Sequence, residues 1–119
     1  MFNKIFRTLL QLCIKNLGEK TIFVSEKKTI LQSLAENYID WMQACGAKGR
    51  CTTCKMLVLQ GQEWLSPLSE AEKKFAQQGR LLPDERLACQ TKPIKLLENE
   101  TLVVSVPTPY KLPHIEYND

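Results

Sequence analysis

Hydrophobic residues recur along this chain with two different periods, which predict strands and helices in turn. Leu10, Leu12 and Ile14 alternate with less apolar positions and predict a half-buried strand. Turn residues at 16–19 and the apolar run at 21–24 predict the rest of a hairpin. From residue 30 the period lengthens to that of a helix. The buried face of this helix is expected to comprise Ile30, Leu31, Leu34, Ala35 and Tyr38.

A second helix and further strands are predicted beyond residue 55. Residues 56–59 (Met-Leu-Val-Leu) are apolar throughout, as in a strand that is covered on both faces. Ser69 and Glu72 have the spacing of a capping box, which predicts a short helix ending near Gly79. Residues 86–90 are compatible with a short strand.

The last strand and the tail complete the predicted domain. Residues 101–106 predict a clear strand, and Pro107, Pro109 and Pro113 are expected to exclude regular structure after it. About five strands and two helices predict a mixed α+β domain. We divide the chain into an N-terminal extension to which the pattern assigns no structure (1–9), a domain (10–106) and a Pro-rich tail (107–119).

Composition excludes several classes of protein. The chain has 119 residues, of which 44% are hydrophobic and 24% charged, as in ordinary globular domains. Without an apolar run of about 18 residues, no membrane span is expected. The net charge of +3 is spread along the chain and does not predict nucleic-acid binding. One histidine, His114, excludes a site that needs two and is expected to face solvent.

Cysteine is the unusual residue here. There are five, an odd number, and three of them fall within residues 45–54. Such a cluster is more typical of metal or redox chemistry in a reducing compartment than of a secreted disulfide framework. We therefore expect a cytoplasmic protein. The basic, acid-free segment before residue 16 leaves the mitochondrial matrix as the alternative.

Four cysteines form a constellation that predicts an inorganic site. Cys45, Cys51, Cys54 and Cys89 follow the pattern C-x5-C-x2-C-x34-C. Structural zinc sites usually join two C-x2-C pairs, and only one such pair is present. A diiron cluster is larger and needs a loop that wraps around it, with two thiolates on each iron.

The residues between the ligands favour wrapping. Gly46, Ala47 and Gly49 let the backbone approach sulfur closely, and inward N–H groups would raise the reduction potential of a cluster. The hydroxyls of Thr52 and Thr53 either add donors or merely fill the turn.

Four segments together resemble the [2Fe–2S] ferredoxins of β-grasp fold. They are CGAKGRCTTC (45–54), the apolar strand at 56–59, LSPLS (65–69) and RLACQ (86–90). The resemblance covers roughly residues 10–106. The gap of five residues between the first two cysteines is that of the adrenodoxin-like and bacterial reductase-linked branch, whereas plant-type ferredoxins have four.

The resemblance implies both a cofactor and a function. One [2Fe–2S] cluster would have its outer iron on Cys45 and Cys51 and its inner iron on Cys54 and Cys89. The protein would be a one-electron carrier between a reductase and an acceptor enzyme, not itself an enzyme. We expect a monomer or weak oligomer.

Basic residues lie beside the predicted ligands, although many ferredoxins present an acidic face. Lys48, Arg50 and Lys55 predict a docking face that suits a neutral or acidic partner. The alternative is that these side chains are ordinary solvated charges.

Other interpretations of the same residues remain open at this point. The site could be a zinc-stabilised binding module without redox activity, or the cluster could serve a redox sensor. Cys51 and Cys54 could form a thioredoxin-like pair, but a strand follows them where that motif opens a helix. Cys13 is expected to be a bystander, and Trp41 and Trp64 to be packing residues.

Overall fold

A computed structural model describes residues 9–42, 53–96 and 100–119 of the chain. In this part the chain forms five strands, two α-helices and two short 3₁₀ turns. The elements in chain order are β1 (Leu9–Ile14), β2 (Lys20–Ser25), α2 (Ile30–Glu36), β3 (Lys55–Gln60), η1 (Gln62–Trp64), α3 (Glu70–Gln77), β4 (Glu85–Leu87), β5 (Thr101–Ser105) and η2 (Thr108–Tyr110).

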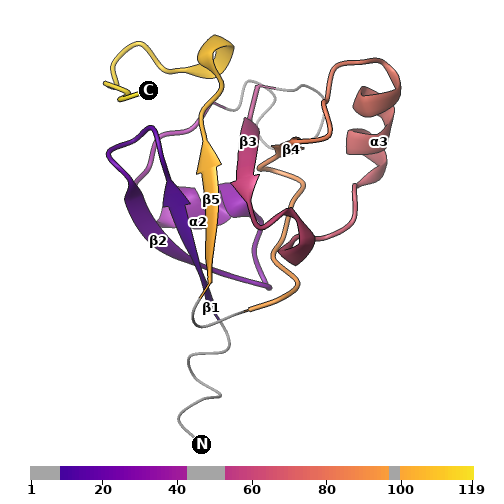
Figure 1. The fold of residues 1–119 in the computed structure, drawn as a ribbon, viewed down its shortest axis with the longest axis horizontal. Helices are drawn as coiled ribbons and strands as arrows, with labels where there is room; N and C mark the ends of the chain where they lie inside the picture. Colours follow the sequence, from indigo (N-terminus) through magenta and orange to yellow (C-terminus); the bar gives the residue numbers. More distant parts are fainter. Residues whose placement is uncertain (1–8, 43–52, 97–99) are drawn as a thin grey trace, which may run out of the picture.

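The five strands form one mixed sheet in the order β2-β1-β5-β3-β4. The hairpin partners β1 and β2 are antiparallel, β1 and β5 are parallel, and β3 is antiparallel to both β5 and β4. Helix α2 lies across one face of this sheet, and α3 stands beside the β3–β4 edge (Figure 1). This arrangement confirms the predicted α+β fold of β-grasp type.

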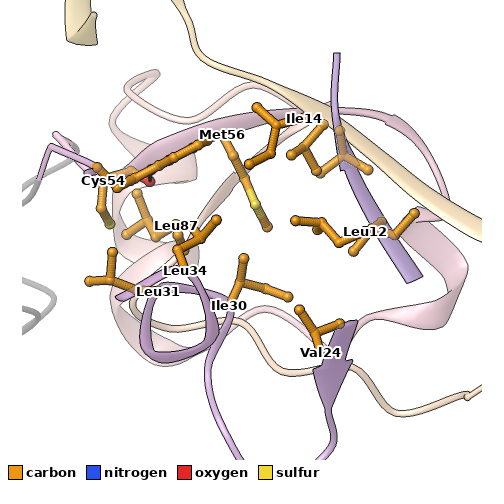
Figure 2. Close-up of a cluster of buried hydrophobic side chains, with 14 of the residues drawn as sticks. Leu12, Ile14, Val24, Ile30, Leu31, Leu34, Cys54, Met56 and Leu87 are labelled. Atoms are coloured by element: carbon orange, nitrogen blue, oxygen red, sulfur yellow. Dashed lines mark hydrogen bonds between the residues drawn. The ribbon is translucent and has the colours of Figure 1, made fainter. Parts of the chain in front are cut away.

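The core lies between the sheet and α2. Alternate residues of β1, β2, β3 and β5 point inward and are fully or almost fully buried, as the period-two pattern predicts. Figure 2 shows Leu12, Val24, Ile30 and Met56 directed toward one another, with Cys54 at the margin of the same cluster. One of the predicted ligands is therefore anchored on the apolar core.

The buried face predicted for α2 is wrong at two positions. Ala35 lies within the helix but is exposed. The helix ends at Glu36, and Tyr38 does not belong to its buried face but is 93% exposed. The apolar period continues in the sequence, but Asn37 caps the helix and Tyr38 turns into the left-handed region. Ile39 then enters the core in its place.

Two strands also differ from expectation. Strand β3 is fully covered on one face and only partly on the other, where Leu57 is half-buried. Leu59 lies at a bulge between Val58 and Gln60 and is 50% exposed. The predicted strand at 86–90 is shorter and earlier, since β4 ends at Leu87 and a turn follows.

The tail is more ordered than its prolines predict. Pro109 lies at the start of η2, where a missing N–H costs nothing. The chain then returns to the β1–β2 turn, where the Asn118 N–H donates to the Asn16 carbonyl at 3.0 Å. The buried Asn16 side chain accepts from the Val106 N–H, and its amide donates to the Val106 carbonyl and to Asp119. The tail is thus fixed at both ends.

Candidate metal centre

Two of the four predicted ligands meet at the edge of the core. Cys54 directly precedes β3, and Cys89 follows the end of β4 by two residues. These strands are antiparallel, with Lys55 opposite Leu87, so the pairing brings the two cysteines together. Their Sγ atoms lie 3.4 Å apart, and the residues are only 1% and 6% exposed.

The separation of these sulfurs fits ligation of one metal ion. A disulfide bond would place them at about 2.05 Å. Two thiolates bound tetrahedrally, each at about 2.3 Å from one ion, lie about 3.8 Å apart. The observed distance is closer to the second value, so this half of the site suits a tetrahedral metal ion with sulfur ligands.

Cys45 and Cys51 fall outside the described residues, as do Lys48, Arg50 and the predicted glycine loop. Within the described ranges no cluster of three or more His, Cys, Asp or Glu side chains could hold a metal ion. The structure therefore brings together two of the four predicted ligands.

The backbone around Cys54 is held from two directions. Its carbonyl accepts a hydrogen bond from the Ala88 N–H at 3.3 Å and another from the Trp41 indole Nε1 at 3.0 Å. Trp41 is buried, as expected of a packing residue, and it fixes the position of a predicted ligand as well.

The turn that carries Cys89 is anchored to the start of α2. The first helical N–H groups have no partner inside their own helix. Here Ile30 donates to the Thr91 carbonyl at 2.9 Å, and Leu31 donates to the Ala88 carbonyl at 3.0 Å. The first turn of the helix thus holds both sides of Cys89 in place.

A buried ion pair supports the same turn from the other side. The Glu72 carboxylate is fully buried and receives hydrogen bonds from the Arg86 guanidinium at 2.8 and 3.0 Å. It also accepts from the Leu87 N–H at 3.0 Å and the Thr91 hydroxyl at 3.3 Å. These contacts tie α3 to the segment that leads into Cys89.

The ionisation of Glu72 follows from these contacts. Burial raises the pKa of Glu72, but the Arg86 hydrogen bonds, the backbone donors at Ser69 and Leu87, and the positive charge of Arg86 outweigh it. The pKa therefore lies below its ordinary value of 4.5.

Gln90 places a side-chain donor next to the predicted inner ligand. Its Nε2 lies 3.6 Å from Cys89 Sγ and 3.4 Å from the Cys89 carbonyl oxygen. A neutral N–H donor directed at a thiolate stabilises the more negative state of a metal centre. The sequence shows Gln90 only as the last residue of the RLACQ motif, and nothing in that motif signals a donor role.

Three other residues with expected roles have clear places in the structure. Cys13 is half-buried on the outer face of the sheet, away from the core. The Lys55 ammonium is paired with Glu85 at 3.0 Å and is nearly buried, so it is not a solvated surface charge. His114 is exposed as expected, but its Nε2 lies 3.0 Å from Asp40, a contact that the sequence does not signal.

Comparison with known proteins decides between zinc and a [2Fe–2S] cluster, the two cofactors that the cysteine pattern left open. A family model described as "2Fe-2S iron-sulfur cluster binding domain" matches residues 14–93, which is more than half of the chain. The match contains all four predicted ligands.

The chain belongs to the [2Fe–2S] ferredoxin family. Its cofactor is a [2Fe–2S] cluster, so the zinc-only alternative is set aside. This ferredoxin is 43% identical to 2Fe-2S ferredoxin-5 of Aquifex aeolicus over 68 residues, which are 56% of this chain and 71% of that protein. It is 35% identical to the 2Fe-2S ferredoxin of Pseudomonas aeruginosa over 81 residues, 67% of this chain and 69% of that protein.

Some relatives carry the ferredoxin domain inside a longer protein. One component of the Na(+)-translocating NADH-quinone reductase of Methylococcus capsulatus is 39% identical over 75 residues, but these are only 17% of that protein and 61% of this chain.

Solved structures agree on the fold. The ISC-like [2Fe–2S] ferredoxin of Pseudomonas putida superposes with a TM-score of 0.58 at 25% identity, covering 83% of this chain and 91% of that one. A ferredoxin reductase in carbazole 1,9a-dioxygenase gives 0.64 at 24% identity, covering 83% of this chain but 27% of that protein. No helix in the described ranges is long and apolar enough to cross a membrane.

Proposed function

We propose that this ferredoxin is a one-electron carrier between a reductase and an acceptor enzyme, with a single [2Fe–2S] cluster held by Cys45, Cys51, Cys54 and Cys89. The observation that carries the proposal is the buried pair of Cys54 and Cys89 sulfurs at 3.4 Å, inside the region that the family model matches. Longer relatives whose names include a reductase support the reductase as partner. We place the carrier in the cytoplasm.

The residues of this chain would supply the environment of that cofactor. When bound, the cluster takes up and releases a single electron. Cys54 and Cys89 would hold the inner iron, and the buried side chains around them exclude water from it. Gln90 donates toward Cys89 Sγ, while Trp41 and Ala88 fix the Cys54 backbone. No proton-transferring or nucleophilic group is needed.

The assignment is tested on protein purified without oxygen. We expect two irons and two sulfides per chain, a red-brown colour, and one rhombic EPR signal of one spin per chain after titration with dithionite. Each of C45A, C51A, C54A and C89A should lose most of the iron and the visible absorption. C13A is the matched control, because Cys13 lies on the outer face of the sheet and should leave both unchanged.

Other outcomes would contradict the proposal. Zinc as the only bound metal would end it, and so would full iron content in any two of the four ligand variants. A redox sensor would hold the same cluster but behave differently. Oxidant would release the cluster reversibly and change the activity of a partner protein, and the loaded protein would not turn over with a reductase.

A further inference from the structure

Tyr38 follows α2 in a conformation that favours glycine. The Tyr38 N–H donates to the Ala35 carbonyl at 3.1 Å, and the Ile39 N–H donates to the Leu34 carbonyl at 3.0 Å. This is the hydrogen-bond pattern of a Schellman helix end, in which the residue at the Tyr38 position is left-handed and usually glycine. Tyr38 has φ +60°, where its Cβ is crowded by the backbone.

The aromatic ring of Tyr38 does not stabilise the fold by burial. Tyr38 is 93% exposed, so its side chain buries almost no apolar surface in this chain. Glycine would relieve the backbone strain without the loss of a packing contact. A strained residue that offers a fully exposed aromatic ring is typical of a binding surface, where tyrosine is enriched among the residues that dominate affinity.

A hollow of about 530 Å³ opens beside this ring, between the end of α2 and the tail. Its lining includes Tyr38, Asp40, Trp41, Leu112 and His114. The buried Trp41 in its wall donates a hydrogen bond to the Cys54 carbonyl. Only the Trp41 side chain therefore separates the hollow from the Cys54 backbone. The electron-transfer path from the proposed cluster to a protein docked in the hollow would be short.

The charges in the hollow favour a cationic side chain. Among the described lining residues, Asp40 supplies the one carboxylate, and its Oδ2 lies 3.0 Å from His114 Nε2. Both side chains are more than half exposed, so this pair is open to exchange with solvent or with a docked group. A planar guanidinium can pair with a carboxylate and stack on a tyrosine ring at the same time, which an ammonium does less well.

We propose that this hollow is the docking site for an arginine side chain of the reductase. The guanidinium lies on the Tyr38 ring and pairs with the Asp40 carboxylate in place of His114. The proposal rests on the proposed function for the identity of the partner, but the chemistry of the hollow can be tested without any reductase.

The first experiment titrates the loaded protein with N-acetyl-arginine amide. Because the chain has a single histidine, the imidazole of His114 gives one Cε1–H NMR signal after ¹³C labelling of histidine at that carbon. We expect a saturable shift of this signal, because the guanidinium replaces the His114 imidazole as the partner of the Asp40 carboxylate. N-acetyl-citrulline amide has the same shape without the charge, and at the same ionic strength it should produce little shift.

Variants separate the ring from the carboxylate. Y38G should weaken the arginine compound about threefold or more, as expected for loss of a cation–π contact at an exposed site, and D40N should weaken it further. Y38F keeps the ring and should bind as the wild type does. F23T removes an exposed aromatic ring from the outer face of the sheet and is the matched control, with no change expected.

The second experiment uses a panel of NAD(P)H-dependent ferredoxin reductases, from which the one that reduces the wild-type protein fastest is chosen. Y38G should raise its KM for the ferredoxin about fivefold, with kcat and reduction potential unchanged. The melting temperature of Y38G should stay the same or rise by a few degrees, because the strain at Tyr38 is relieved. A merely structural role would lower it.

Equal shifts with the arginine and citrulline compounds, or wild-type affinity in Y38G, would overturn the proposal. An unchanged KM in Y38G with an active reductase would also overturn it. If no reductase reduces the loaded wild-type protein, the proposed reductase partner fails instead, and the titration still decides whether the hollow binds a guanidinium.

Discussion

At the scale of single residues, the amide of Gln90 lies beside the sulfur of a proposed ligand. Its Nε2 lies 3.6 Å from Cys89 Sγ. The variant Q90L removes this donor, so the reduced and more negative state loses stabilisation. Since a hydrogen bond is worth about 1 kcal/mol and a one-electron couple shifts about 59 mV per tenfold change, we expect a potential lower by about 20–60 mV. Spectroelectrochemical titration measures it.

Q77L is the control for this prediction, because Gln77 is exposed at the end of α3. It should leave the potential within a few millivolts of the wild type. An unchanged potential in Q90L would mean that the Gln90 amide donates to the Cys89 carbonyl alone.

Gln90 and Tyr38 also show where prediction of single residues from the sequence stops. A donor aimed at sulfur depends on one rotamer, which no pattern encodes. Tyr38 fits the apolar period of the preceding helix, but the hydrogen bonds that end the helix depend on Asn37 and on Ile39 entering the core. The helical period of apolar residues correctly predicted burial in α2 only for Ile30, Leu31 and Leu34.

At the scale of elements, Glu72 and Arg86 join α3 to β4. The variant E72Q removes the charge while Arg86 stays buried among groups arranged for a carboxylate. We expect the free energy of unfolding to fall by about 3–5 kcal/mol, as for other buried pairs that lose one member. E70Q is the matched control two residues away, since Glu70 is almost fully exposed and should cost little. Urea unfolding of the loaded proteins measures both.

The effect of E72Q should also depend on pH. Because the pKa of Glu72 is lowered in the folded state, its charge stabilises the protein above the unfolded value of about 4.5, and this contribution is lost as pH falls further through the folded pKa. The stability difference between wild type and E72Q should therefore be full above pH 5 and shrink below pH 4. A constant difference across this range would contradict the role of the Glu72 charge.

Element types were predictable from the sequence, and their contacts were not. The capping box of Ser69 and Glu72 is present as expected. However, the same Glu72 carboxylate also reaches Arg86 and Leu87, which are 14 and 15 residues away along the chain. The capping motif therefore gives no sign of these long-range contacts. Capping uses only part of the hydrogen-bonding capacity of a carboxylate, and the remaining capacity is free for other donors.

At the scale of the whole molecule, Asn16 connects the tail to the sheet. The variant N16A removes its buried hydrogen bonds with Val106 and the contact with Asp119. We expect a loss of about 2–4 kcal/mol, because the Val106 groups stay buried without these partners. Trypsin cleavage after Lys111, which pairs with Asp119, should become faster.

N118A serves as the control at the same turn. The Asn118 side chain accepts one hydrogen bond from the exposed Gly18 N–H, so its loss should cost less than about 1 kcal/mol. Equal losses in N16A and N118A would show that the tail is held by its backbone contacts and not by the buried amide.

For the candidate site, the sequence predicts four ligands, and the structure describes the positions of two of them. Spacing identified four cysteines, and the pairing of β3 with β4 explains why Cys54 and Cys89 meet although 34 residues separate them. The supports of this pair come from α2 and α3, and these contacts depend on packing between elements that no motif records. For the same reason the hollow between α2 and the tail has no signature in the sequence.

The short gap between the Cys54 and Cys89 sulfurs has a consequence for how the protein matures. The distance of 3.4 Å is longer than a disulfide bond, but two thiols this close need only a small movement to form one before iron is bound. An oxidant that removes two electrons and two protons from them would close that bond and block the inner half of the site. Reconstitution of the cluster in the laboratory should therefore begin from the fully reduced chain.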